Sequence, residues 1–500
     1  MKQIIFSILF LSFIISGCGG NQLTQVINTQ TENSGNFSDP LSLPESDDKL
    51  PPHEDNMILV HYRDRIPDIS EKIGGTVINT FSIGDKKYGK IKLPSVSSIV
   101  DTVRTIDKDI IYAEPVYTYT LDMVPDDLYY NYQYAPQICS SEDAWDITTG
   151  SEDITIAILD TGVNGTHCEF TGKMVTGFNA VTGEEFDGRI NSDVMGHGTH
   201  VAGIAAATGN NGTGIAGVAW KCRIMPVVMA EGNEDIPNDV VLRAIVWAIE
   251  HGARVINMSF SDKNGYSLSL IDAINYAMER NVVLVSSMGN THRAMVRYPA
   301  ACQGIIAVGA VDGRKQGASF STGGNHISIS APGVDIYSTA KDGHYVSMSG
   351  TSMSAPFVTG VCALLASFHK GITPEEIRSQ IELTAEDTGE PGWDRDTGWG
   401  NINVKAALGT MRENKYGRVK VYLKTLSGEP VVNNTVLLYD GSGNMSGFTK
   451  TDKDGQASFY YVNRGSNYRA LSFDSKSGKT RYSGYFDVND SSTVTVDSFE

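Results

Sequence analysis

Three residues in this chain could together activate a hydroxyl nucleophile: Asp160, His197 and Ser352. Asp160 follows the apolar segment 154–159, and Ser352 lies in Gly-Thr-Ser-Met-Ser-Ala-Pro, just before the apolar run 357–365. A serine hydroxyl attacks well only when a base removes its proton, and a histidine oriented by a carboxylate is a common base. The first turn of a buried helix also offers free backbone N–H groups to developing negative charge. The competing interpretation is that Ser352 and its neighbour only cap a helix.

Two histidines, His197 and His200, are spaced so that they share one face of a helix, which makes a metal site an alternative. The segment His-Gly-Thr-His has no glutamate in the His-Glu-x-x-His position, and no third ligand lies nearby in the sequence. We therefore expect His197 to act as a base near a helix start and His200 to be a buried structural residue. A metallohydrolase that uses both histidines is the rival hypothesis.

The elements that position these residues follow an alternating pattern. The segment 154–159 is almost continuously apolar, as in strands covered on both faces, and functional groups gather at the carboxyl ends of such strands. Helices and strands then alternate, with helices expected at 239–250 and 267–279 and strands at 255–260, 282–287 and 305–311. The sequence predicts an α/β fold with a doubly wound parallel sheet.

The segments around the three candidate residues extend well beyond them, as Ile-Leu-Asp-Thr-Gly-Val, Gly-His-Gly-Thr-His-Val-Ala-Gly and Gly-Thr-Ser-Met-Ser-Ala-Pro. In the order Asp, His, Ser they resemble the subtilisin-like serine peptidases. The resemblance covers about 127–407 and implies a serine endopeptidase domain at 124–411 that works through an acyl-enzyme. A catalytically silent peptide-binding protein on the same scaffold is the alternative.

The resemblance also implies the surroundings of the nucleophile. Asn290 and the backbone N–H of Ser352 match the family's oxyanion donors, although Asn290 after Gly289 is also typical of a left-handed turn. Ser259, Phe260 and Ser261 match the segment that pairs with the substrate and forms one wall of the S1 pocket. The segment on the other side of the substrate is expected at or just beyond 228–232.

Arg297 departs from the family pattern, because many members have glycine at this position in the base of the S1 pocket. A guanidinium pointing into the pocket would favour an acidic P1 side chain through a charge-assisted pair. Asp122, in the expected maturation region, suits this hypothesis. The alternative is that Arg297 extends outward to solvent.

A calcium site is the cofactor that the resemblance implies. The segment Asn210-Asn-Gly-Thr-Gly-Ile215 resembles the family's strong calcium loop, and hard oxygen ligands suit this ion. The expected ligands of a structural Ca²⁺ are Asp127, Glu169, Asn211, Thr213 and Ile215.

The N-terminal part is expected to direct export. Residues 1–18 have a short charged start, an apolar run and Ile-Ser-Gly-Cys, which resembles a bacterial lipobox with Cys18 as the lipidated residue. A plain secretory signal is the alternative. The polar residues 19–55 predict a flexible tether. These features indicate the bacterial cell envelope or the extracellular space.

Residues 56–123 predict a small α+β domain with the order β-α-β-β-α-β, a ferredoxin-like arrangement. It resembles the propeptides of subtilisin-like peptidases, so we expect it to help folding and to inhibit the enzyme, with 117–123 in the cleft until cleavage. An independent binding module is the alternative interpretation.

Period-2 alternation after residue 411 predicts an antiparallel β-sandwich at 415–500. It resembles transthyretin-like, carboxypeptidase-regulatory-like modules, and a stabilising or spacer role is favoured because no catalytic cluster is visible in it. The net charge of −18 argues against nucleic acid or an anionic membrane surface as the main partner. The cysteines after Cys18 are odd in number, and their pairing stays open.

Overall fold

The computed structural model describes residues 53–497, apart from 64–65, 67–70, 72, 95–97, 105–109, 119–123, 233–234, 262–264, 266, 293–294, 426 and 474–479. The predicted signal segment, Cys18 and nearly all of the predicted tether therefore lie outside the described residues. The chain forms two compact units, Met1–Leu121 and Asp122–Glu500.

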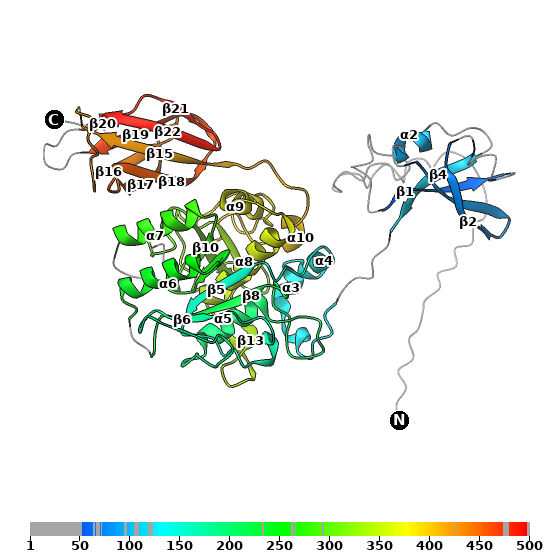
Figure 1. The fold of residues 1–500 in the computed structure, drawn as a ribbon, viewed down its shortest axis with the longest axis horizontal. Helices are drawn as coiled ribbons and strands as arrows, with labels where there is room; N and C mark the ends of the chain where they lie inside the picture. Colours follow the sequence, from blue (N-terminus) through cyan, green and yellow to red (C-terminus); the bar gives the residue numbers. More distant parts are fainter. Residues whose placement is uncertain are drawn as a thin grey trace, which may run out of the picture. The chain divides into compact units, whose positions relative to one another are not determined.

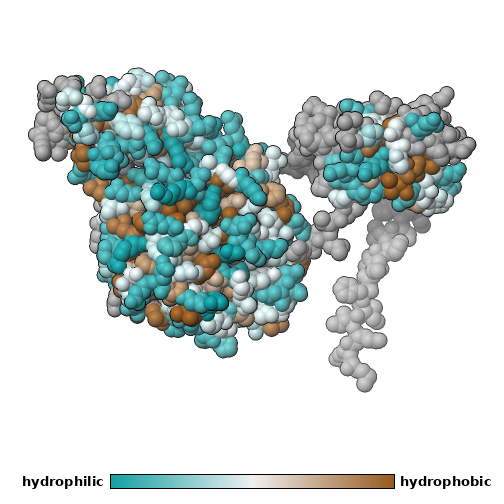
Figure 2. Space-filling view, in the orientation of Figure 1, coloured by the Kyte–Doolittle hydropathy of each residue, from teal (hydrophilic) through white to brown (hydrophobic). Residues whose placement is uncertain are grey.

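The first unit is built on a four-stranded antiparallel sheet in the order β2-β3-β1-β4. Its elements are β1 His53–Tyr62, β2 Thr76–Ile83, β3 Lys86–Lys92, α2 Ile99–Arg104 and β4 Ile110–Tyr117. The tether prediction ran too far, because residues 53–55 already belong to β1, where His53 pairs with Tyr117 of β4. The first helix of the predicted β-α-β-β-α-β order would lie between β1 and β2, in a stretch that is mostly outside the described residues. β2 exposes Ile78, Phe81 and Ile83, and Figure 2 shows apolar surface on this unit.

The second unit contains the predicted doubly wound sheet, in the order β12-β11-β10-β9-β5-β8-β6-β7. Neighbouring strands pair in parallel except β6 and β7. The central strands are buried almost throughout, which is why their sequences are apolar on both faces. The strands are β5 Thr155–Asp160, β6 Gly177–Asn179, β7 Glu184–Phe186, β8 Arg223–Val228, β9 Val255–Met258, β10 Val283–Ser287, β11 Ile305–Val311 and β12 Ile329–Pro332, with a separate hairpin of β13 Ile336–Thr339 and β14 Tyr345–Met348.

Helices cover this sheet in two pairs, α5 with α8 and α6 with α7, and Figure 1 shows α6 and α7 on one side of it. α8 is long and apolar enough to cross a membrane, but 83% of its apolar window is buried in the core of the described chain. The helices are η2 Tyr130–Tyr132, α3 Tyr134–Ile138, α4 Ser141–Trp145, η3 Cys168–Phe170, α5 His197–Ala206, α6 Asn238–Glu250, α7 Leu268–Glu279, α8 Thr351–Phe368, α9 Pro374–Leu383 and α10 Val404–Ala407.

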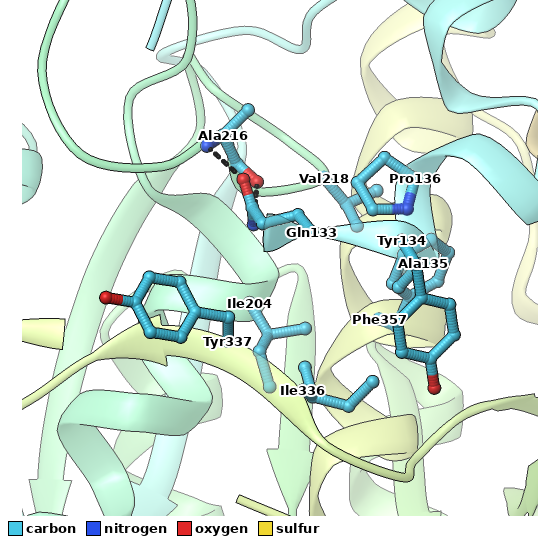
Figure 3. A pocket seen from close by; sticks show the side chains of 10 residues that line it. All are labelled: Gln133, Tyr134, Ala135, Pro136, Ile204, Ala216, Val218, Ile336, Tyr337 and Phe357. Atoms are coloured by element: carbon cyan, nitrogen blue, oxygen red, sulfur yellow. Dashed lines mark hydrogen bonds between the residues drawn. The ribbon is translucent and has the colours of Figure 1, made fainter. Parts of the chain in front are cut away.

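A small cavity of about 20 Å³ lies where the segment around α3 packs against the rest of the unit, and Figure 3 shows the side chains that line it. The side chain of Gln133 bonds both the N–H and the carbonyl of Ala216, at 2.9 and 3.0 Å. Tyr134 donates its hydroxyl to the carbonyl of Val334 at 2.6 Å. The cavity has room for about one water molecule, so it is a packing feature and no ligand site.

The C-terminal module is a sandwich of two small sheets, β18-β15-β22 and β17-β16-β19-β20, with β21 paired to β19. Most strand pairs are antiparallel, as predicted, but β15 and β22 pair in parallel, from Arg418 with Ser491 to Lys424 with Asp497, and there the prediction was wrong. The strands are β15 Tyr416–Lys424, β16 Thr435–Tyr439, β17 Met445–Lys450, β18 Gln456–Asn463, β19 Gly465–Phe473, β20 Thr480–Tyr482, β21 Phe486–Val488 and β22 Ser491–Asp497.

The module packs on α9 through buried charges. Arg418 of β15 forms a two-pronged pair with Glu375, at 2.6 and 2.8 Å. The fully buried carboxylate of Glu382 forms ion pairs with Arg378 at 2.7 Å and with Lys415 at 2.9 Å. A close approach elsewhere also joins the two parts, because a Cβ added at Gly447 would lie 1.6 Å from the amide nitrogen of Gln303.

The segment that connects α10 to β15, residues 408–415, is hydrogen-bonded to α9 at Thr410, Arg412 and Lys415. The Gln380 amide group donates to the carbonyls of Ala407 and Thr410 at 3.0 and 3.3 Å, and its oxygen accepts from the N–H of Arg412 at 2.8 Å. Ser379 accepts from the N–H of Lys415 at 3.0 Å. We call residues 408–415 the joint segment.

The five cysteines within the described residues are all free, so no disulfide forms among them. Cys139, Cys302 and Cys362 are buried, and burial raises the pKa of each thiol to about 12. They therefore act as small apolar residues.

Candidate active site

The structure brings Asp160 and His197 into direct contact at the carboxyl end of the central strand β5. Asp160 ends β5, and His197 is the first residue of α5. The Nδ1 atom of His197 lies 2.7 Å from Oδ1 of Asp160. The charge of Asp160 raises the pKa of His197 above its ordinary value, although burial opposes this shift. With Nδ1–H donated to the carboxylate, Nε2 is left as the basic nitrogen.

The close approach of α5 to β5 requires the glycine that follows His197. A Cβ at Gly198 would lie 2.1 Å from the carbonyl oxygen of Gly162 and 3.0 Å from the Cβ of Asp160. The Gly-His-Gly motif therefore has a packing reason as well as a chemical one.

Asp193 holds the turn before α5, a role that was not predicted from the sequence. This carboxylate is 6% exposed and accepts from the N–H groups of Gly196 and Thr199 at 2.7 and 2.8 Å. It also accepts from the hydroxyls of Thr161 and Thr199 at 2.8 and 2.5 Å. It thus ties the segment after Asp160 to the start of α5, and its charge helps to raise the pKa of His197. An aspartate just before a helix was the available signal.

His200 is fully buried one turn along α5. Its Nε2 atom faces the carbonyl oxygens of Ile336 and Val346, at 3.0 and 3.1 Å, so this nitrogen must donate a hydrogen bond. Burial lowers the pKa of His200 to about 4. Within the described residues, no three side chains of the His, Cys, Asp and Glu types gather where they could hold a metal ion. His200 therefore has the contacts of a structural residue.

Ser352 is the second residue of α8, and it is linked to the end of β9. Its hydroxyl donates to the carbonyl of Ser259 at 3.2 Å, and the Ser259 hydroxyl donates back to the carbonyl of Ser352 at 2.9 Å. The hydroxyl of Ser352 thus makes its hydrogen bond with Ser259 rather than with His197 in this structure. Catalytic hydrogen bonds of this kind often form fully only when substrate is present.

Asn290 lies beside the start of α8. Its Oδ1 atom accepts from the N–H of Thr351 at 2.9 Å and from the Thr351 hydroxyl at 3.0 Å. These two bonds fix the side-chain amide so that its Nδ2 group lies on the side of Gly350, where an added Cβ would be 3.1 Å away. An NH₂ group held in this way, next to Ser352, is suited to donating to an oxyanion.

A buried polar chain behind Ser352 was also not predicted. Asn257 is fully buried in β9, donates to the hydroxyl of Ser259 at 2.9 Å and accepts from the hydroxyl of Thr359 at 3.0 Å. The bonds of Ser259 continue this chain to Ser352. The sequence offered one indication of this chain of bonds, the asparagine within the otherwise apolar strand Val-Ile-Asn-Met. A polar residue in a buried strand is informative because it needs a hydrogen-bond partner.

The residues expected to contact substrate lie around this centre. Phe260 and Ser261 follow β9 directly, and Ser261 approaches Gly289, whose added Cβ would lie 3.2 Å from the serine oxygen. Arg297 is 4% exposed, so the expectation that it extends outward to solvent is wrong. The segment 228–232 starts at the end of β8, where the N–H of Met229 donates to the carbonyl of Asp160 at 2.8 Å.

The residues predicted to bind calcium gather around two buried carboxylates. Asp127 is 5% exposed and accepts from the N–H of Asn210 at 2.7 Å. Glu169 is fully buried and accepts from the N–H of Ile215 at 3.1 Å and from the side chain of Asn211 at 3.4 Å. Burial raises the pKa of both carboxyl groups, and the charge of Asp127 adds to the shift of Glu169. Thr213 lies in the same loop and bonds Asn211 through its N–H at 2.8 Å.

Comparison with known proteins decides the family. Residues 151–400, half of the chain, match the model of the subtilase family of peptidases. The chain belongs to the subtilase family. It is a serine endopeptidase with the subtilisin-like α/β fold.

Named relatives agree with this assignment. The chain is 40% identical over 317 residues to a thermophilic serine proteinase of Bacillus sp. (strain AK1), a match that covers 63% of this chain and 77% of that protein. It is 40% identical over 287 residues to thermitase of Thermoactinomyces vulgaris, covering 57% of this subtilase and 99% of thermitase. The crystal structure of fervidolysin from Fervidobacterium pennivorans superimposes with a TM-score of 0.65 at 28% identity, covering 89% of this chain and 78% of that one.

Proposed function

We propose that this subtilase cleaves peptide bonds through an acyl-enzyme on Ser352, with His197 as base and Asp160 as its orienting carboxylate. The observation that carries the proposal is the 2.7 Å contact between His197 and Asp160. Asp160 ends β5, and the neighbouring strand β9 leads to Ser259, which is hydrogen-bonded to Ser352. A carboxylate that holds Nδ1–H fixes the tautomer and stabilises the imidazolium that forms in the reaction.

In the first half of the reaction, Ser352 Oγ bonds to the scissile carbonyl carbon while its proton passes to Nε2 of His197. The carbon–nitrogen bond then breaks, and the proton on His197 goes to the leaving amine. In the second half, water gives its proton to His197 and attacks the ester, which releases the acid and returns the proton to Ser352. The side-chain amide of Asn290 and the N–H of Ser352 would donate to the oxyanion in both halves.

A fluorophosphonate that labels serine nucleophiles tests this proposal against its rivals. We expect labelling and peptide hydrolysis by the wild type, no effect of zinc chelation, and loss of both in Ser352→Ala. A silent peptide-binding protein would bind peptide without being labelled. A metallohydrolase that uses His197 and His200 would keep its activity in Ser352→Ala and lose it to the chelator.

Protein or peptide substrates would lie extended between Ser259–Ser261 and the segment 228–232. Both segments continue from the carboxyl ends of parallel strands, β9 and β8, which is where open α/β sheets place their ligands. An extended peptide can bond to such segments through its backbone, as in added-strand recognition.

We also propose that the enzyme is made as a zymogen, with the domain at 56–123 as its own folding aid and inhibitor. The exposed apolar residues of β2 support a binding role for this sheet, because a domain of this size seldom exposes several on one strand without a partner. N-terminal sequencing of the mature protein tests the proposal, since a mature start near 123 requires removal of this domain.

Export and anchoring through Cys18 belong to the same proposal. One relative, a halolysin-like extracellular serine protease of Natrialba magadii, is 36% identical over 313 residues. Incorporation of labelled fatty acid into the wild type and not into Cys18→Ser is the result expected for a lipid anchor. In this proposal the membrane is a partner only through that anchor, and the C-terminal module stabilises the peptidase part.

We further propose that a structural calcium ion binds at the loop 210–215. Burial raises the pKa of both Asp127 and Glu169, and the charge of Asp127 raises that of Glu169 further, so a cation beside these carboxylates would relieve unfavourable buried negative charge. Hard oxygen donors suit Ca²⁺. Asp127, Glu169 and Asn211 would hold the ion by side chains, and Thr213 and Ile215 by backbone carbonyls. The ion would stabilise the fold by neutralising these charges, and it would take no part in catalysis.

A further inference from the structure

The buried side chain of Arg297 has no partner for its charge among the described residues. It is 4% exposed, and within that part of the chain its Nε atom has no hydrogen-bond partner and no carboxylate forms an ion pair with it. Two other basic side chains in buried surroundings differ, because Lys173 donates to the carbonyl of Ala206 and Arg418 pairs with Glu375. An unpaired buried charge is strongly unfavourable, so a guanidinium left in this state indicates that its acceptor comes from outside the chain.

The position of Arg297 shows where that acceptor would bind. Its Cγ atom would lie 3.7 Å from a Cβ placed on Gly289, and the hydroxyls of Ser261 and Thr322 are 3.2 and 3.4 Å from the same point. Gly289 directly precedes Asn290, and its N–H bonds the hydroxyl of Thr351 at 3.0 Å. The side chain of Arg297 therefore packs against the strand end that leads to the proposed oxyanion donor.

We infer that Arg297 forms the base of the S1 pocket and selects substrates with an acidic residue, glutamate or aspartate, on the acyl side of the scissile bond. A guanidinium binds a carboxylate through two parallel N–H···O bonds. A pocket whose guanidinium has no other partner discriminates against neutral side chains, because they leave this charge unpaired. The chain itself contains a candidate bond, because the two compact units divide next to Asp122. The inference rests on the proposed function, since it assigns a pocket to that reaction.

Matched fluorogenic peptides that differ only at P1 test the inference. Glutamate, isosteric glutamine and leucine are compared by kcat/KM in the wild-type enzyme. We expect glutamate to exceed glutamine by about tenfold or more, as the loss of a charge-assisted pair requires. In Arg297→Gln the ratio of kcat/KM for the glutamate peptide to that for the leucine peptide should fall by about the same factor. Arg297→Lys, which keeps the charge but not the two-pronged geometry, should lie between the two.

Arg314→Gln is the matched control, because the Arg314 side chain is 81% exposed. Fluorophosphonate labelling and the melting temperature of every variant separate the possible outcomes. A wild type that is labelled and cleaves leucine or glutamine as fast as glutamate overturns the acidic pocket and leaves the serine mechanism intact. A wild type that is neither labelled nor active overturns the proposed function, and with it this inference. The wild-type comparison decides even if the Arg297 variants fold poorly.

Discussion

Asn257 offers the sharpest test of how the fold supports the nucleophile. Replacing it with leucine, which is similar in size, removes both of its hydrogen bonds without opening a large cavity. The hydroxyl of Thr359, which is fully buried, then loses its acceptor. Such an unsatisfied group costs about 1–3 kcal/mol, and loss of the bond to Ser259 adds about 1 kcal/mol. We therefore expect the free energy of unfolding to fall by about 2–4 kcal/mol.

The double variant Asn257→Leu with Thr359→Val separates stability from positioning. Removing both polar partners together is nearly neutral, so most of the lost stability should return. The chain of bonds from Asn257 through Ser259 to the carbonyl of Ser352 stays broken, however. We expect kcat to remain reduced in both variants, by up to about 100-fold if the nucleophile shifts by about 1 Å.

Urea unfolding in the inactive Ser352→Ala background measures the free energies without self-digestion. Titration with a fluorophosphonate counts active sites, so that kcat refers to folded enzyme. If Asn257→Leu loses stability but keeps the wild-type kcat, the buried chain only supports packing. If the double variant is no more stable than the single one, the unsatisfied hydroxyl is the wrong cause.

Three further outcomes follow from the charges described above. Asp160→Asn should move the acidic limb of the kcat/KM profile to lower pH, because His197 must be neutral to act and the charge of Asp160 raises the pKa of His197 above its ordinary value. The kcat should fall by about 10⁴-fold, and an unmoved limb would contradict the assignment. Removal of calcium with EGTA should lower the melting temperature of the wild type and leave that of Asp127→Asn nearly unchanged. The lost stabilisation of the wild type should be about 2.7 kcal/mol when calcium is at about 100 times its Kd. Equal melting temperatures of the wild type with and without EGTA would exclude the site. Glu382→Gln should cost about 3–5 kcal/mol in urea unfolding because two cations lose their buried partner, whereas Glu386→Gln, whose side chain is 46% exposed, should cost less than about 1 kcal/mol.

The chemistry-bearing segments were visible in the sequence because they are local. The strand before Asp160, the helix starting at His197 and the helix carrying Ser352 each combine an apolar pattern with a polar residue at one end. Alternation of helices and strands also predicts a parallel sheet, since parallel neighbours need crossover connections. Local pattern and topology therefore give the place of the candidate site.

What the sequence could not show depends on contacts between distant segments. Asn257 looks like an ordinary strand residue until Thr359, 102 positions away, supplies its partner. The parallel pairing of β15 with β22 joins the first and last strands of the module, and no alternation within either strand encodes that choice. The sequence of β17, Met-Ser-Gly-Phe-Thr-Lys, shows no clear alternation, and its glycine lies where the side chain of Gln303 approaches from another part of the chain.

The joint segment bears on how long the enzyme survives its own activity. Connections between folded parts are common sites of proteolytic nicking when their backbone is exposed and free to extend. Residues 408–415 are instead hydrogen-bonded to Gln380 and Ser379 of α9. The ion pairs of Glu382 with Lys415 and of Glu375 with Arg418 hold the start of β15, the strand that follows. We therefore expect a second copy of the peptidase to cut there more readily once α9 and the module have separated. On this expectation, the lifetime of the two-part enzyme depends on the stability of the interface as well as on the sequence of the connection.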